Sequence, residues 1–442
     1  MTIRECLHAL HGIAARMRAL PVVGLFLLAT AVCGCPSTPD PAAPPRGVCA
    51  QPELAVLSLD PDADGPQIHP AAAWDGEALQ VVWNGPRDPD SGDFAVRKTR
   101  LLCDGSAEAI QILDPGALGS DVDPSVAVSA GRTLVAWQSD DGGSPYNLSI
   151  GLVTAPVSGD PDRPWRTLQM QRNEQPYEGN AWMPRLADDA GGGFVLAGSR
   201  GIDAVGRFQG FVQALDLDGE PFGPSEDAGI EFEVSQVEPA IAVRANRTRI
   251  LGWEERPDAG QDKVVWRELL PDGLGPASQV ADMQAEAELG PLARVAIAVE
   301  RSPREAVLFV AHGGSGGALD VTLEVVDRGD GLPGPTLVLG RAQDTEHTPG
   351  IALGTDGGVL VYHRVLSGFA NELVLQRFRL DGDPDAPLTG ITMDDPQVVQ
   401  TDEPVAPYPP SITWIDDSVW FLAWSEGSGA GLRVRGRFVV LD

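Results

Sequence analysis

A unit that repeats along the chain constrains the fold of this sequence more than any other feature. Each copy opens with a short apolar stretch, which in most copies follows a proline. The seven openings read HPAAAW, DPSVAV, MPRLAD, EPAIAV, RVAIAV, TPGIAL and PPSITW. Their second residues are Pro70, Pro124, Pro184, Pro239, Val295, Pro349 and Pro410, so one unit is about 55 residues long. A repeat of this length exceeds a helical hairpin and suits a four-stranded blade of a β-propeller.

A second apolar stretch follows each opening after a short polar turn. The seven stretches read ALQVVW, RTLVAW, GFVLAG, TRILGW, AVLFVA, GVLVYH and WFLAWS. They are rich in β-branched and aromatic residues, as a buried strand requires. Third and fourth strands follow, such as GFVQALDL and EFEVSQ, with Asp-Gly and Pro supplying the turns. Each complete copy is therefore expected to form four strands.

An aromatic residue ends the second strand in most copies. These residues are Trp83, Trp137, Trp253, Tyr362 and Trp424. They could stack on sugar rings if they lined a central funnel, or they could pack between neighbouring blades. Because the aromatic residue recurs at equivalent positions of successive blades, packing is the favoured interpretation.

The two ends of the repeat array complement each other. The seventh copy stops at Asp442 after its third strand, RVRGRFVVL, whereas an unassigned strand, ELAVLSL (Glu53 to Leu59), precedes the first copy. Pairing of the two would give every blade four strands and leave no open edge between the first and last blades. The sequence thus predicts an all-β fold over residues 53–442, a seven-bladed β-propeller of four-stranded blades, closed by the N-terminal strand completing the last blade.

The N-terminal residues 1–34 have the features of an export signal. Arg4, Arg16 and Arg18 precede an almost unbroken apolar run from Leu20 to Val32. That run is too short to span a hydrocarbon core of about 30 Å, but it fits the hydrophobic part of a signal peptide.

The tetrapeptide Val32-Cys33-Gly34-Cys35 resembles the lipobox of bacterial lipoproteins. The resemblance implies lipidation of Cys35 and cleavage before it, with ordinary secretion as the alternative. Residues 35–52 are rich in proline and would form a lipidated, semi-rigid tether. Pro36 stands where an aspartate can retain a lipoprotein at the inner membrane, which favours the outer membrane or the cell surface.

Two cysteines remain in the mature chain besides the lipidated one. Cys6 and Cys33 leave with the signal peptide, and Cys49 and Cys103 stay. In an oxidising compartment they are candidates for one disulfide. Two free buried thiols are the alternative.

The formal net charge of −31 limits the partners of the chain. So acidic a surface repels nucleic-acid phosphates and anionic lipid headgroups, and it makes cations or basic partners more plausible. The simpler explanation is solubility outside the cell. Nucleic acid is therefore not expected as a partner.

The connections between second and third strands, and those between blades, are long and polar. Both sets fall at the same end of a propeller, and loops on a rigid scaffold are common binding sites. We expect the functional face at this end. Its candidate residues are Asp60, Asp62, Asp64, Asp88, Asp90, Asp93, Asp140 and Asp141, together with His312 and His363, which follow equivalent strand ends in neighbouring blades.

Three short motifs suggest chemistry. The segment DPDADG resembles the opening of a calcium loop, with Asp60, Asp62 and Asp64 as ligands, but Ala71 stands where the closing glutamate belongs. An acidic inter-blade turn is the alternative. SDDGGSPY (residues 139–146) resembles the Asp-box of sialidase-like propellers, with Pro-Tyr in place of Thr-Trp. GGSGG (residues 313–317) matches G-x-S-x-G, but strand-like flanks favour a loop over a nucleophile elbow.

The whole mature chain resembles the propeller-repeat lipoproteins of bacteria, and this resemblance carries no catalytic residue with it. We expect a monomeric, non-enzymatic binding or scaffolding module for protein or polysaccharide at the cell envelope. A sialidase-like glycoside hydrolase and an accessory subunit of an outer-membrane assembly complex are the alternatives. Calcium is the one cofactor that the sequence suggests.

Overall fold

The computed structural model describes most of the chain after residue 48. The described residues are 49, 52–88, 92–113, 119–139, 151–152, 166–167, 171–172, 175–176, 181–190, 192–201, 207–228, 234–257, 262–270, 273–285, 295–313, 320–339, 345–355, 357–366, 371–416 and 418–441. The predicted signal peptide, Cys35 and most of the predicted tether lie outside them. All of the strands described below belong to one compact unit, residues 44–442.

Six antiparallel sheets of four or five strands make up most of this unit, and each is named here after its innermost strand. The β2 sheet contains β2 (Ile68–Trp74), β3 (Leu79–Pro86), β4 (Phe94–Leu101) and β5 (Gln111–Ile112). The β12 sheet contains β12 (Ala181–Asp188), β13 (Phe194–Gly201), β14 (Phe208–Leu215) and β15 (Glu226–Asp227). The β16 sheet contains β16 (Val234–Val243), β17 (Arg249–Pro257), β18 (Asp262–Leu270), β19 (Gly273–Leu274) and β20 (Ser278–Ala285).

The remaining three sheets follow in chain order. The β21 sheet contains β21 (Ala296–Val299), β22 (Val307–Gly313), β23 (Asp320–Asp327) and β24 (Thr336–Val338). The β25 sheet contains β25 (Thr345–Leu353), β26 (Gly357–Val365), β27 (Asn371–Asp381), β28 (Gly390–Met393) and β29 (Gln397–Val398). The β30 sheet contains β30 (Ser411–Asp416), β31 (Val419–Glu426), β32 (Arg433–Val440) and β1 (Leu57–Ser58).

Among the described residues, six such sheets are present, rather than the seven that the repeats predict. In place of a seventh, the described residues hold a hairpin of β6 (Asp121–Ser129) and β7 (Arg132–Ser139), and the short pairs β8 (Gly151–Leu152) with β9 (Arg166–Thr167) and β10 (Gln171–Arg172) with β11 (Gln175–Pro176). The third and fourth strands expected in the second copy fall on a stretch of which most residues lie outside the described ones.

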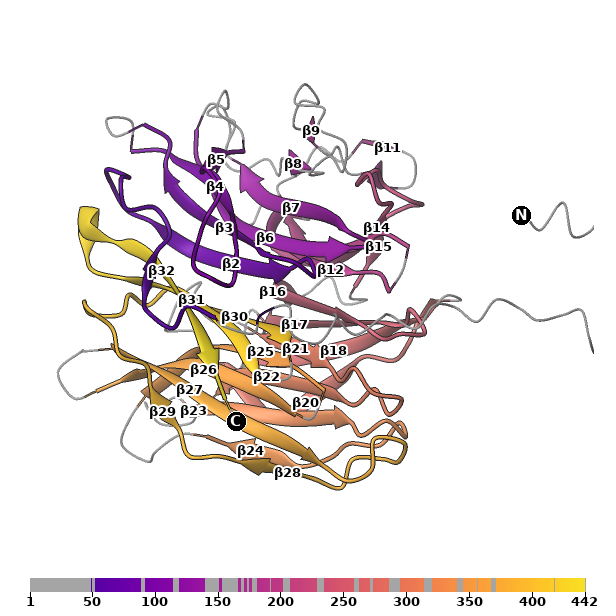
Figure 1. Cartoon of the computed structure of the whole chain (residues 1–442). Coiled ribbons are helices and arrows are strands. Elements are labelled where there is room, and N and C mark those ends of the chain that lie inside the picture. Colours follow the sequence, from indigo (N-terminus) through magenta and orange to yellow (C-terminus); the bar gives the residue numbers. More distant parts are fainter. Residues whose placement is uncertain are drawn as a thin grey trace, which may run out of the picture. The chain divides into compact units, whose positions relative to one another are not determined.

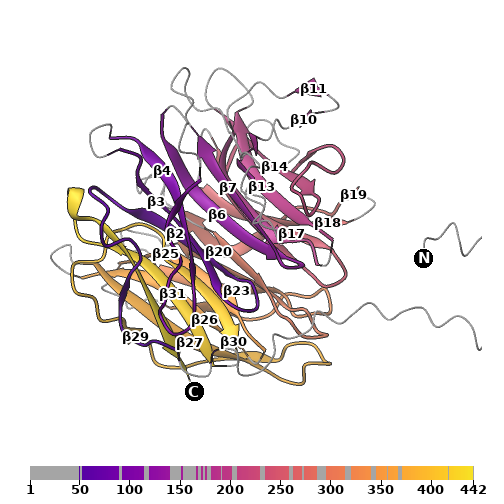
Figure 2. The same ribbon diagram turned by 45° about the horizontal axis from the view of Figure 1, so that its top comes forward.

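The innermost strands form a closed cycle. β2 contacts β6, which contacts β12, and the contacts continue through β16, β21, β25 and β30 back to β2. The last sheet, drawn in yellow, accordingly lies beside the first, drawn in indigo (Figures 1 and 2). Ser and Thr side chains join neighbouring inner strands at this seam, since Ala72 N donates to Ser411 Oγ and Thr413 Oγ1 donates to Ala72 O. The predicted all-β propeller class is thereby confirmed.

The N-terminal strand closes the ring as expected, although it is shorter than the predicted Glu53 to Leu59. β1 pairs antiparallel with β32, Leu57 opposite Gly436 and Ser58 opposite Arg435. Beyond the strand, Leu59 N donates to Val434 O at 3.3 Å. The β30 sheet thus obtains its fourth strand from the other end of the chain.

The hydrophobic core lies between adjacent sheets. One cluster joins Val310 and Leu323 of the β21 sheet with Tyr362 and Phe378 of the β25 sheet. The aromatic row follows the same rule, because Trp83, Trp137, Trp253, Tyr362 and Trp424 are each at most 1% exposed and each contacts the preceding sheet. Packing between blades, the favoured interpretation of this row, is confirmed.

Helix is almost absent from the described residues, where the 3-10 turn η2 (Gly429–Gly431) is the single helical element. Within that part of the chain, no helix is long and apolar enough to cross a membrane.

Candidate functional site

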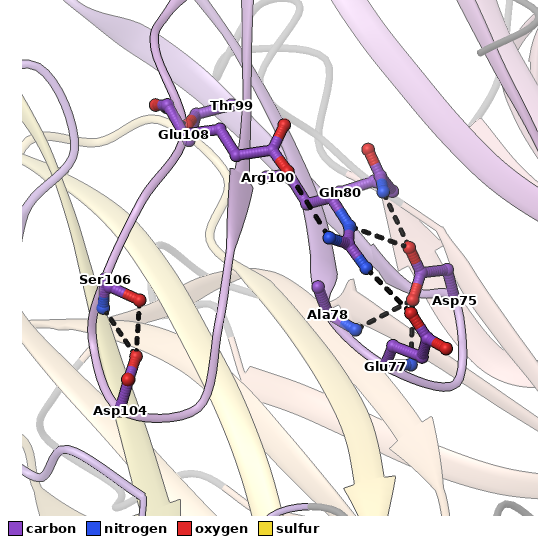
Figure 3. Close-up of polar contacts among 9 residues, drawn as sticks. All are labelled: Asp75, Glu77, Ala78, Gln80, Thr99, Arg100, Asp104, Ser106 and Glu108. Carbon is purple, nitrogen blue, oxygen red and sulfur yellow. Dashed lines mark hydrogen bonds and ion pairs between the residues drawn. The ribbon is translucent and has the colours of Figure 1, made fainter. Parts of the chain in front are cut away.

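The end of each sheet at which first and second strands join is closed by a short turn and is called here the short-turn end. In the β2 sheet a hydrogen-bonded network fixes this turn (Figure 3). Asp75 Oδ1 accepts from the backbone N–H groups of Glu77 and Ala78 at 2.8 and 2.7 Å, and Asp75 Oδ2 accepts from Gln80 Nε2 at 2.7 Å. Burial raises the pKa of Asp75, but these hydrogen bonds and the charge of Arg100 outweigh it and lower the pKa overall. The network therefore stabilises the turn between β2 and β3.

The opposite end, where the inner strands begin, is called here the long-loop end. Five of the inner strands carry a β-bulge there, at the residue before the proline that opens the repeat. Proline has no N–H to complete the ladder, and the extra residue of a bulge accommodates it. The bulge residues have positive φ: His69 (53°), Asp123 (52°), Met183 (55°), Glu238 (52°) and Thr348 (48°). Such backbone costs about 1–3 kcal/mol per residue and persists where a surrounding structure holds it.

The side chains of the first two bulges contact each other. His69 Nδ1 lies 3.0 Å from Asp123 Oδ1, and the ring of Tyr408 meets His69 edge to face at 5.0 Å. Asn84 secures this contact from the second strand, since its amide donates to Asp121 O and accepts from Asp123 N. The side chains of His69 and Asp123 are 17% and 20% exposed, so they border solvent at the long-loop end of the ring.

The position of Asn84, directly after the aromatic residue of the second strand, is polar and buried in every copy. Its occupants are Asn84, Gln138, Ser199, Glu254, His312, His363 and Ser425, each at most 5% exposed. A buried polar side chain needs hydrogen-bond partners. Asn84 finds them on the next inner strand, whereas Ser199 Oγ and Ser425 Oγ at equivalent positions have no partner among the described residues.

Two of these positions hold histidines, and the structure adds a third. His347 lies directly opposite His363 in the β25–β26 register, and their rings meet edge to face with centroids 5.2 Å apart. Thr348 Oγ1 lies between them, 3.1 Å from His347 Nδ1 and 3.2 Å from His363 Nδ1. His312 comes from the neighbouring β21 sheet, and neither of its ring nitrogens has a hydrogen-bond partner.

Burial keeps these imidazoles uncharged at neutral pH. It lowers the pKa of His312 to about 4, assisted by the charges of His347 and Arg256. Burial also lowers the pKa of His347 to about 4, and burial together with His347 lowers that of His363 to about 3. The desolvation of a charged imidazole is the dominant cause in all three.

Charged side chains near the histidines are already paired. Arg256 forms a bidentate pair with Glu254 at 2.9 and 3.0 Å. Arg364 Nε lies 3.2 Å from Glu346 Oε1, and both side chains are at most 5% exposed. The cluster of His312, His347, Thr348 and His363, called here the histidine cluster, therefore offers neutral hydrogen-bonding groups.

The three aspartates proposed as calcium ligands do not converge. Asp60 is buried and binds Arg97 Nη1 through Oδ2 at 2.7 Å, whereas Asp62 and Asp64 are exposed. Among the described residues, no group of three His, Cys, Asp or Glu side chains is arranged to hold a metal ion. The side-chain geometry gives the calcium hypothesis no support.

The other predicted face residues divide into three groups. Asp88 is exposed and Asp93 half-buried at the β3–β4 connection. Asp90, Asp140 and Asp141 lie outside the described residues, as do most of SDDGGSPY and the centre of GGSGG. The strand-like flanks predicted for GGSGG are confirmed, because they form strands β22 and β23. His312 and His363 do belong to neighbouring sheets at the long-loop end, but they are buried within strands and are not surface residues.

Cys49 and Cys103 form a disulfide with their Cα atoms 5.5 Å apart. Glu53 N also donates to Cys103 O at 2.7 Å. The segment that supplies β1 to the β30 sheet is therefore fastened to the β2 sheet, across the seam of the ring.

Sequence reasoning did not single out His347 and Thr348 as site residues. Their position in the repeat could have identified them. Thr348 directly precedes Pro349, as His69 directly precedes Pro70 in the first repeat, and His347 stands one residue earlier. Side chains at that repeat position belong to the bulges and gather at the long-loop end.

Comparison with known proteins supports the fold. No family model matches the chain, and no curated protein matches it. A crystal structure of a protein of unknown function from Dyadobacter fermentans DSM 18053 has a TM-score of 0.51 at 10% identity, covering 88% of this chain and 99% of that one. At this identity the similarity concerns the fold alone.

Two enzymes of known structure are more distant. The polysaccharide lyase Uly1 has a TM-score of 0.49 at 10% identity, covering 87% of this chain and 91% of its own. A Trypanosoma rangeli sialidase in complex with 2,3-difluorosialic acid has a TM-score of 0.42 at 10% identity, covering 88% of this chain and 57% of its own. These similarities are too low to indicate an activity.

Proposed function

We propose that this protein is an exported, lipid-anchored propeller that binds a polysaccharide or a protein of the cell envelope at its long-loop end. The observation that carries the proposal is the gathering of polar bulge side chains there on a closed ring of inner strands. His69 and Asp123 meet across two neighbouring inner strands, and Thr348 bridges two histidines. A rigid scaffold that presents polar groups and long connections at one end is suited to recognition.

Export and anchoring are proposed from the N-terminal sequence. The apolar run from Leu20 to Val32 and the lipobox-like segment ending at Cys35 support a lipoprotein signal. The Cys49–Cys103 disulfide is compatible with an oxidising compartment outside the cytosol. Pro36 supports the outer membrane or the cell surface as the destination.

We also propose that the complete propeller has seven blades. Support comes from the seven openings in the sequence and from the cycle of inner strands, in which β6 stands between β2 and β12. In this proposal the β6–β7 hairpin is the inner half of the second blade.

Binding is favoured over glycan hydrolysis by the state of the charged groups around the histidine cluster. Hydrolysis of a glycosidic bond generally uses two carboxyl groups that flank the scissile bond. Glu254 and Glu346 are engaged by Arg256 and Arg364, and His312 and His347 are uncharged at neutral pH. These residues offer hydrogen bonds and no free carboxylate pair.

The binding proposal can be tested with the lipidated full chain in detergent. Binding to isolated envelope polysaccharides and to solubilised outer-membrane proteins is measured for the wild type, for Asp123→Asn at the long-loop end, and for Glu77→Gln, an 82% exposed side chain at the short-turn end. We expect Asp123→Asn to weaken binding and Glu77→Gln to leave it unchanged. Equal weakening by both variants, or no binding to either fraction, would contradict the proposal. Release of sugar from a chromogenic glycoside would favour the hydrolase instead.

The anchor has its own test. Labelled palmitate is expected to enter the wild type and not a Cys35→Ala variant. Incorporation into both would place the lipid elsewhere.

A further inference from the structure

The histidine cluster holds buried ring nitrogens that have no hydrogen-bond partner. At the equivalent position of the β2 sheet, Asn84 satisfies its amide on the next inner strand. His312 is 3% exposed and leaves both ring nitrogens without a partner, and His363 is fully buried and leaves Nε2 without one. A buried polar group without a partner in a native protein calls for an explanation, such as an ordered water, an ion or a functional role.

Thr348 couples the two histidines of the β25 sheet. Its hydroxyl has one proton, so it donates to one Nδ1 and accepts from the other. When His363 Nδ1 donates, the hydroxyl donates to His347 Nδ1, and His347 carries its own proton on Nε2. In the reverse arrangement His347 Nε2 presents a lone pair. The same nitrogen can thus donate or accept a hydrogen bond without any change of charge.

A β-branched residue with positive φ is uncommon, and Thr348 adopts a φ of 48°. The bulge that imposes this conformation is the same feature that places Oγ1 between the two rings. Because the other bulge residues with positive φ are not β-branched, the position is more strained here than in the other sheets.

The local charges define the class of ligand. Arg256 and Arg364 are neutralised by Glu254 and Glu346, and the imidazoles are uncharged, so no free positive group is left among them for an anion. The net charge of −31 also repels polyanions. Among the described residues no three side chains are arranged for a metal ion. Neutral groups that donate and accept hydrogen bonds match the hydroxyl groups of an uncharged sugar.

We propose that the histidine cluster is a subsite for a neutral carbohydrate, with His347 Nε2 contacting a sugar hydroxyl and Thr348 and His363 positioning that ring. His347 is 9% exposed, more than His312 or His363. The inference rests on the proposed function, of which it specifies the polysaccharide branch and the contacting residues.

The test uses the full chain and defined probes: maltoheptaose, cellohexaose, xylohexaose and, as the anionic counterpart, hexagalacturonate. Titration calorimetry gives the affinities of the wild type, His347→Ala, His347→Gln and Thr348→Val. Ser425→Ala is the matched control, because Ser425 occupies the equivalent buried position of the β30 sheet. We expect a neutral oligosaccharide to bind, His347→Ala to weaken it roughly tenfold, as for one lost hydrogen bond, and Gln to restore part of the loss. Thr348→Val is expected to weaken it less, and Ser425→Ala to have no effect.

Nitrogen-15 NMR of labelled histidines gives a readout that a purely structural role would not move. The wild-type His347 Nε2 resonance is expected to shift when the oligosaccharide is added. Because this measurement uses the wild type, it tests the inference even if His347→Ala does not fold. Neutral binding that His347→Ala and Thr348→Val leave unchanged would overturn the inference while the proposed function stands. Preference for hexagalacturonate, or binding to envelope proteins alone, would also overturn it. Absence of binding to every probe, polysaccharide and protein fraction would remove the proposed function itself.

Discussion

Leu57 lies opposite Gly436 where the N-terminal strand β1 pairs with the final strand β32. A Cβ atom at residue 436 would lie 2.5 Å from Cζ of Phe421, a fully buried ring. We therefore expect Gly436→Ala to lower the free energy of unfolding by about 1–3 kcal/mol, as overpacking in a core does. Chemical denaturation checks this. Gly431→Ala is the control, because a Cβ there meets nothing within 4 Å. Similar losses in both variants would contradict the packing argument.

The disulfide between Cys49 and Cys103 is expected to stabilise the closed ring. The two cysteines are 54 residues apart, and a cross-link of this span typically contributes about 2–4 kcal/mol, mainly by restricting the unfolded chain. Cys103→Ser should lower the melting temperature, and a reducing agent should lower that of the wild type to a similar value. The same reagent should have no effect on Cys103→Ser. A wild-type melting curve that does not respond to reduction would show that the bond contributes nothing to closure.

The fold class could be predicted because its signals are local. A proline near the start of most repeats, an apolar second strand and, in most copies, an aromatic residue at its end recur with one period, and burial of Trp83 or Trp424 follows from that recurrence. The second copy could not be completed in the same way, since its expected outer strands fall largely outside the described residues. The pairing of β1 with β32 was predictable because each end lacked what the other supplied.

The histidine cluster could not be predicted because it depends on a one-residue shift in the pairing of β25 with β26. The pair Gly350 and Val361, continued without interruption, would place His347 opposite Arg364. The bulge before Pro349 shifts the pairing by one residue and brings His347 to His363. A one-residue shift changes which side chains meet, and hydrophobic patterns do not reveal where such a shift occurs. The contribution of His312 further requires contact between two sheets.

The buried histidines predict a loss of stability in mild acid. An ordinary histidine has a pKa of 6.5, whereas burial lowers the pKa of His312 and His347 to about 4 and that of His363 to about 3. Below pH 6.5 the unfolded chain therefore binds protons that the folded chain does not, and stability falls as the pH falls. At pH 5 the loss is about 1–2 kcal/mol for each histidine, because one pKa unit corresponds to about 1.4 kcal/mol.

Urea denaturation at pH 7, 6 and 5 measures this slope, in a range where most carboxyl groups remain ionised. His312→Gln should reduce the slope by about a third, since one of three titrating groups is removed. Ser425→Ala should keep the wild-type slope. Stability that stays constant between pH 7 and 5 would mean that the imidazoles are protonated as readily in the folded chain as in the unfolded one.

The contact between Asp60 and Arg97 allows a test of whether Asp60 belongs to an ion pair or is a calcium ligand. Asp60 Oδ2 lies 2.7 Å from Arg97 Nη1, their side chains are 4% and 14% exposed, and the backbone carbonyl of Asp60 accepts from Gln67 Nε2 at 2.8 Å. Breaking a buried pair leaves one charge uncompensated, so Asp60→Asn and Arg97→Met should each lower the free energy of unfolding by about 3 kcal/mol or more. The double variant should lose less than the sum of the two, because neither charge is then left alone.

Calcium and a chelator should leave the melting temperature of the wild type unchanged. If calcium instead raised it, and Asp60→Asn abolished the effect, Asp60 would be a metal ligand and its contact with Arg97 a feature of the metal-free state.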